Sequence, residues 1–132
     1  SRSVTAVTCG GSANDLYFAD AKKGKIKRVT GSDLRLNKGL DGDDYLGDEC
    51  DDAVDDITAL TFHGNYLYWS VLDENPSDGI WRKNVRNTLK DGKCKECFGA
   101  KSDKNIPAGC SAGKELEFFK QTEDGVQALI VY

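Results

Sequence analysis

Short apolar runs separated by turn residues recur along the chain, and three of them occur twice in the same order. From Val4 the sequence reads VTAV, a glycine-rich turn, LYFAD, a Lys-Gly pair and IKRV. From Ile57 it reads ITAL, the turn HGN, LYWSV, an Asp-Gly pair and IWRKNV. Runs rich in β-branched and aromatic residues and bounded by glycine or asparagine are typical of strands. Because no segment has a sustained helical period, the pattern predicts an all-β chain of antiparallel strands.

A third and weaker copy is expected later in the sequence. It starts at Ile106 with IPAG, continues with LEFFK from Leu116 and ends with VQALIVY after an Asp-Gly pair. The interval from Ile106 to Leu116 equals the interval from Ile57 to Leu67, which is typical of a structural repeat. The predicted organisation is one domain, residues 1–132, with repeats at about 4–40, 57–93 and 106–132 and an acidic connection at 41–56.

Two of the copies resemble a known repeat family. LYWSV followed by GIWRKNV, and LYFAD followed by KIKRV, are similar to the YWTD repeats (low-density lipoprotein receptor class B) of extracellular six-bladed β-propellers. The resemblance implies that each copy is a blade and that three blades make half of a propeller. The motif aspartate is retained as Asp20, whereas Val71 and Lys120 replace it in the other copies. A β-trefoil, which also has three repeats in a chain of this length, is the alternative fold.

Three blades would not close a ring. They would leave strand edges and one apolar sheet face exposed at each flank, and exposed edges favour pairing with another chain. We therefore expect a second copy or another chain to complete the propeller.

The charges of the chain are unevenly distributed. There are 18 Lys and Arg residues against 22 Asp and Glu residues, and the basic first forty residues are followed by an acidic block at 41–56. A nucleic-acid-binding protein usually presents a net basic face, so we expect no nucleic-acid partner. No apolar run approaches the length of a membrane helix, so we expect no membrane span.

Five cysteines in a chain this short favour an oxidising compartment, so we expect a secreted protein with disulfide bonds. They are Cys9, Cys50, Cys94, Cys97 and Cys110. The odd count leaves one thiol for a contact with another chain, and the sequence leaves the connectivity open. A bridge is expected among the last three, and Cys9 and Cys50 are near enough to the first copy to bridge across it. The alternative for Cys94 and Cys97 is a zinc site, for which the chain offers few further ligands.

The acidic connection is a candidate calcium site, because Ca²⁺ takes six to eight oxygen ligands. The candidate ligands are Asp41, Asp43, Asp44, Asp48 and Glu49. The spacing does not match an EF-hand loop, in which a glycine would stand at Leu46. The alternatives are a solvated loop whose acids face the basic first third of the chain, and a docking patch for a basic partner. Calcium is the one cofactor that the sequence suggests.

The strand residues of the repeats supply the candidate ligand-binding side chains. These are Tyr17, Asp20, Tyr68, Trp69 and Trp81. Alternation on a strand turns one of each aromatic pair inward, so core packing is the main alternative for them. His63 lies in a tight turn and no serine stands in a nucleophile elbow, so no catalytic residue is predicted. The predicted function is a non-catalytic extracellular recognition or assembly module that presents propeller-face loops to a protein or glycan. The alternative is a calcium-dependent propeller hydrolase of the lactonase or esterase kind.

Overall fold

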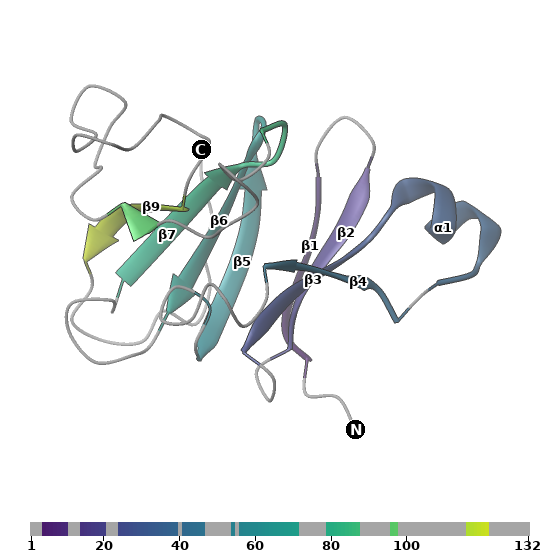
Figure 1. Cartoon of the computed structure of the whole chain (residues 1–132), viewed down its shortest axis with the longest axis horizontal. Helices are drawn as coiled ribbons and strands as arrows, with labels where there is room; N and C mark the ends of the chain where they lie inside the picture. Colours follow the sequence, from purple (N-terminus) through teal and green to yellow (C-terminus); the bar gives the residue numbers. More distant parts are fainter. Residues whose placement is uncertain are drawn as a thin grey trace.

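The described part of the computed structural model contains two β-sheets and one short helix, with strands where the first two copies predict them (Figure 1). The residues that it describes are 4–10, 14–20, 24–39, 41–46, 54, 56–71, 79–87, 96–97 and 116–121. All strand pairs except one short outer pair are antiparallel. The prediction of an all-β chain is therefore confirmed for this part of the molecule.

The first sheet is a four-stranded meander. In sheet order its strands are β1 (Val4–Gly10), β2 (Asp15–Asp20), β3 (Lys25–Val29) and β4 (Asp43–Leu46). Asn14 and Gly24 adopt the left-handed conformation just before β2 and β3, which lets the chain reverse tightly at these two points.

Helix α1 (Gly31–Leu36) lies between β3 and β4, and the hydrophobic pattern does not predict it. Six residues are too few to show a helical period. Its ends nevertheless carry familiar signals: Thr30 is the N-cap and accepts a hydrogen bond from the Asp33 N–H at 3.2 Å. Asn37 ends the helix in the left-handed conformation, with φ 54°.

The second sheet begins with the same meander. Its first three strands are β5 (Ile57–His63), β6 (Tyr66–Val71) and β7 (Gly79–Asn84). β9 (Leu116–Gln121) pairs antiparallel with β7, and the two-residue β8 (Glu96–Cys97) pairs parallel with β9. The sheet order is therefore β5-β6-β7-β9-β8.

The two sheets share one pairing register. Tyr17 lies opposite Arg28 in the first sheet, and Tyr68 lies opposite Arg82 in the second. This agreement confirms that the LYFAD and LYWSV segments occupy equivalent positions, each as the second strand of its sheet.

The first strands also share an irregularity. The register of β1 against β2 shifts between Val4 and Ala6, and that of β5 against β6 shifts between Ile57 and Ala59. A bulge at the same point of the VTA and ITA segments adds local twist to both strands. The first two copies therefore fold as equivalent units.

The described strand of the third copy belongs to the second sheet, whereas the spacing predicts it as part of a third blade. β9 lies beside β7 as β4 lies beside β3, and in both pairs the register shifts directly after an isoleucine, Ile26 or Ile80. LEFFK is thus the fourth strand of the second unit. The repeat spacing misleads because a short apolar strand carries no mark of its place in a sheet. The rest of the repeat expected at about 106–132 lies outside the described residues.

We call the face of each sheet that carries the tyrosine of its LY pair the front, and the opposite face the back. Residues directly opposite each other on paired strands share a face. The front of the first sheet carries Tyr17, Ala19, Ile26 and Arg28. The back of the second sheet carries Leu60, Phe62, Leu67, Trp69, Val71, Trp81 and Lys83.

The core forms where the front of the first sheet packs against the back of the second. At this interface β1 of the first sheet lies next to β5 of the second (Figure 1). The ring centroids of Tyr17 and Phe62 are 5.1 Å apart, and buried residues of both sheets belong to one hydrophobic cluster. Gly10 has no room for a side chain here, because an added Cβ would lie 2.2 Å from Cγ of Phe62.

The back of the first sheet is buried at β2 and β3 but exposed at β1. Phe18 and Val29 are buried on this face, and an added Cβ at Gly42 would lie 3.1 Å from the Phe18 ring. Toward β1 the same face is open, because Val7 is 55 % exposed and Cys9 is exposed.

Candidate functional site

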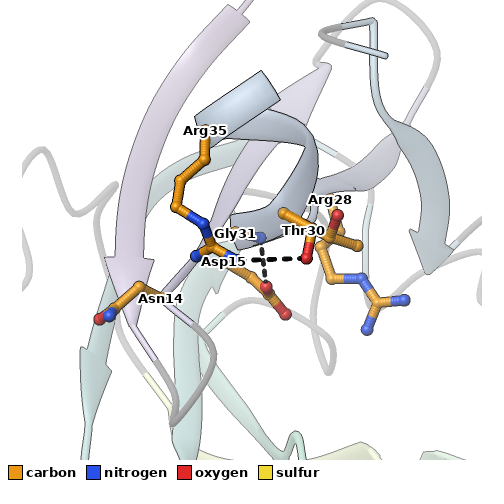
Figure 2. Close-up of a pocket in the computed structure, with 7 residues that line it drawn as sticks. Asn14, Asp15, Arg28, Thr30, Gly31 and Arg35 are labelled. Atoms are coloured by element: carbon orange, nitrogen blue, oxygen red, sulfur yellow. Dashed lines mark hydrogen bonds between the residues drawn. The ribbon is translucent and has the colours of Figure 1, made fainter. Parts of the chain in front are cut away.

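A hollow of about 340 Å³ lies beside α1 at one end of the first sheet (Figure 2). Its lining residues are Asn14, Asp15, Arg28, Thr30, Gly31, Ser32 and Arg35. The turn before β2, the end of β3 and the first turns of α1 supply them. These segments meet because β3 leads directly into α1 beside the turn that joins β1 to β2.

Two hydrogen bonds fix the polar groups of the hollow. The Asp15 Oδ1 accepts from the Gly31 N–H at 2.8 Å, which ties the turn to the start of α1 (Figure 2). The Arg35 guanidinium donates to the Ser32 hydroxyl at 3.4 Å. Among the described residues, Asp15 and Arg35 do not form an ion pair with each other. The carboxylate and the guanidinium therefore line one hollow with hydrogen-bonding capacity left over.

Arg28 borders the hollow but serves a second cluster between the sheets. Figure 2 shows its guanidinium pointing away from Asp15. Its Cζ lies 5.5 Å from the centroid of the Tyr45 ring, a cation–π contact. Burial raises the pKa of the Tyr17 hydroxyl, while the neighbouring Arg28 lowers it by a smaller amount.

Tyr45 and Lys83 complete this cluster. Burial raises the pKa of the Tyr45 hydroxyl, with a further rise from Tyr17 and an opposing effect of Arg28. The Tyr45 Oη has no hydrogen-bond partner in the part of the chain that the structure describes. Lys83 is 2 % exposed, and its ammonium donates to the carbonyl oxygens of Asn84, at 2.9 Å, and Asn87. Because the same ammonium lies 6.0 Å from the Tyr45 ring centroid, the cluster joins the two sheets.

Comparisons with known proteins give no assignment. No protein-family model and no curated protein matches this chain. The resemblance to YWTD repeats therefore rests on the motifs of the sequence and stays a hypothesis.

The structure buries all five side chains that the sequence suggests for ligand binding. The exposed fractions are 2 % for Tyr17, 1 % for Asp20, 8 % for Tyr68 and 0 % for both Trp69 and Trp81. Their burial favours core packing for the four aromatic side chains, and ligand binding by the five residues stays a prediction. Both aromatic residues of each pair are buried because β2 and β6 are covered on both faces at these positions, whereas alternation assumes one face in water.

The acidic connection is described only in part. Asp41, Asp43 and Asp44 are exposed, and Asp48 and Glu49 lie outside the described residues. Asp44 pairs with Lys25 at 2.8 Å and with Lys27 at 3.8 Å, so one acid faces the basic first third of the chain. Within the described residues no three potential ligand side chains form a group that could hold a metal ion. Calcium binding by this segment remains a prediction.

The disulfide prediction is likewise untested. Cys9 carries a free, exposed thiol on β1. Cys50, Cys94 and Cys110 lie outside the described residues, and of Cys97 only the backbone is described. In the same part of the chain, no helix has the length and apolar character needed to cross a membrane.

Sequence reasoning missed the hollow. Its side chains are polar residues in turns, where the hydrophobic pattern carries no information. Two signals were present: the Asn14-Asp15 pair before a strand, and a threonine three residues before Asp33, which is typical of a helix start. Neither signal alone shows that the two segments meet.

Proposed function

We propose that this protein is a non-catalytic extracellular recognition and assembly module, built from two neighbouring blades of a propeller-like stack. The observation that supports it is the front-to-back packing of two sheets with the same register and bulges. In such a stack each sheet offers its back to the front of another. The extracellular setting is inferred from the five cysteines.

The β1 side of the back of the first sheet is the open end of this arrangement. Leu16 and Phe18 occupy the positions that Leu67 and Trp69 occupy in the second sheet, where the packing of the other sheet leaves both fully buried. In the first sheet the corresponding face is open beside Val7. Exposed apolar surface on a strand at the edge of a sheet favours association.

We infer that a second copy of this chain covers this surface. Val7 and Cys9 are neutral and point to the same side of β1, so two copies can meet there without charge repulsion. This contact joins identical back faces in a two-fold dimer, the commonest oligomer, and it covers the open end of each stack rather than extending the front-to-back order.

Sedimentation velocity at micromolar concentration in reducing buffer tests the proposal. We expect a reversible dimer, and we expect Val7→Lys to weaken dimerisation at least about tenfold, because the contact would bury unpaired charges. The matched control is Leu36→Lys, which changes another large exposed apolar side chain, on α1, and is expected to leave the dimer intact. A monomer at all concentrations, or equal loss in both variants, would count against the proposal.

A further inference from the structure

The hollow beside α1 offers hydrogen-bonding groups of several kinds. Every residue that lines it is polar or glycine, and the set includes an amide, a carboxylate, two hydroxyls and the Arg35 guanidinium. Most of its lining comes from the turn before β2 and from α1, and Arg28 of β3 forms its border with the cluster between the sheets. The hollow is separate from the open surface at Val7, so an inference about it does not depend on the proposed dimer.

The polar groups of the hollow are held in place by hydrogen bonds, and they retain donors and acceptors for a ligand. Of the Asp15 carboxylate, Oδ1 is taken by the Gly31 N–H, and the second oxygen remains to accept a hydrogen bond. Arg35 donates one long bond, at 3.4 Å, and keeps further N–H groups. Asn14 is exposed, and its left-handed backbone sets the direction of its amide. Figure 2 shows Arg35 extending from the helix toward Asp15 and Gly31.

This combination of groups narrows the class of ligand. Asp15 disfavours an anion in the hollow, and Arg35 disfavours a cation. The lining has no apolar side chain against which an apolar ligand could pack. A hydroxyl group both donates and accepts a hydrogen bond, so neighbouring hydroxyls can bind the carboxylate and the guanidinium at the same time. The volume of about 340 Å³ is at the lower end of small-molecule sites, which span about 300 to 1,000 Å³.

We propose that this hollow binds one pyranose ring of a neutral saccharide. Asp15 and Asn14 accept from ring hydroxyls, and Arg35 donates to a neighbouring one. The lining has no aromatic ring on which a sugar could stack, so affinity for a single sugar is in the millimolar range.

The test is a titration of the ¹⁵N-labelled full chain, followed by amide shifts in proton–nitrogen correlation spectra. Glucose, galactose, mannose and N-acetylglucosamine are the probes, added one at a time. We expect at least one of them to shift the amides of Asp15, Gly31 and Ser32 in a saturable way. We expect Asp15→Asn and Arg35→Gln each to weaken that binding about tenfold, which corresponds to the loss of one or two hydrogen bonds.

The variants separate ligand contact from loss of structure. Asn at position 15 keeps an oxygen for the Gly31 N–H, so an unchanged Gly31 amide shift in the free protein shows that the hollow is intact. The control is Arg86→Gln, which removes an exposed arginine after β7, outside the lining, and should leave binding unchanged.

Two results would overturn the proposal. One is the absence of saturable shifts at these amides with all four sugars. The other is a stronger response to sodium sulfate that increases in Asp15→Asn, which would identify an anion site instead. Failure of the dimer test would leave these outcomes unaffected, because the titration reports on the hollow alone.

Discussion

Tyr45 places a hydroxyl between the sheets without a hydrogen-bond partner among the described residues. Its ring is nevertheless well packed, with an edge-to-face contact to Tyr17 at 5.2 Å and the Arg28 guanidinium above it. The ring therefore contributes to stability, whereas the buried hydroxyl subtracts from it, since an unpaired buried polar group costs about 1 to 3 kcal/mol.

Removing the hydroxyl should consequently stabilise the protein. We expect Tyr45→Phe to raise the free energy of unfolding at neutral pH by about 1 kcal/mol, measured by urea denaturation. Tyr17→Phe is the contrasting variant, because it removes a hydroxyl that interacts with Arg28 and should lower stability. A loss of stability in Tyr45→Phe would show that its hydroxyl has a role that the described contacts do not reveal.

The same two tyrosines predict how stability changes at alkaline pH. Their pKa values are raised above the ordinary value of 10.0, so the unfolded chain releases its protons at lower pH than the folded chain. Their contribution is fully present below about pH 10, and the free energy of unfolding then falls as pH rises through the folded values. In the same denaturation series, Tyr45→Phe should make this fall shallower, whereas a fall of equal steepness would contradict the assignment.

At the level of single residues, the sequence predicted that the repeat aromatics belong to the core or to a binding shelf, and burial favours the core. The hollow could not be predicted, because Asp15 and Arg35 are twenty residues apart and only the path of β3 brings them together. Lys83 is a further case: basic residues usually lie in water, and no local pattern indicates that two backbone carbonyl groups bind this one.

Helix α1 lies between β3 and β4 of the first sheet, and Thr30 caps its N-terminus. The hydroxyl of Thr30 accepts from the Asp33 N–H, and the Thr30 carbonyl oxygen accepts from the Leu34 N–H. With only six residues, the helix has little stability of its own. Loss of the N-cap should therefore destabilise the whole helix.

We expect Thr30→Ala to lower the free energy of unfolding by about 1 kcal/mol, the usual effect of losing an N-cap. Hydrogen exchange should show faster exchange confined to residues 31–36. Thr30→Ser keeps the accepting hydroxyl and serves as the control, with little change expected in either measurement. Equal effects of the two substitutions would mean that the threonine methyl group, not the cap, matters.

Among the elements, strands with repeated motifs were predictable and the others were not. β1 to β3 and β5 to β7 each carry an apolar or aromatic run with a turn beside it. β9 was predicted as a strand but assigned to a third blade, because nothing in the LEFFK sequence indicates that it pairs with β7. β4 lies in the acidic connection at 41–56, where charged residues conceal a short strand whose apolar residues are Tyr45 and Leu46.

Across the whole molecule, one hydrophobic cluster contains buried residues of both sheets. The lowest-exposure residues of the first sheet, such as Ile26 and Ala19, belong to the same cluster as Trp69 and Trp81 of the second. A shared core predicts that the sheets unfold together, as single domains of this size usually do.

Both tryptophans of the chain lie in the second sheet, which allows a direct test. Ile26→Ala, in the first sheet, should lower the free energy of unfolding by about 2 to 5 kcal/mol. We expect the urea midpoint from tryptophan fluorescence to fall together with the midpoint from circular dichroism. Leu36→Ala, at an exposed site on α1 and outside the shared cluster, is the control and should change neither midpoint appreciably. A tryptophan midpoint unaffected by Ile26→Ala would show that the sheets unfold independently.

The missing side chain at Gly10 has a mechanical consequence for this joint core. Gly10 is the last residue of β1, and the Phe62 ring occupies the space where its Cβ would stand. β1 and β5 are in close contact at this point. Tyr45 and Lys83 are in contact at another point of the same interface. The absence of a side chain at Gly10 therefore sets how closely the two sheets approach. A larger residue at this position would push Phe62 away from Tyr17 and separate the sheets.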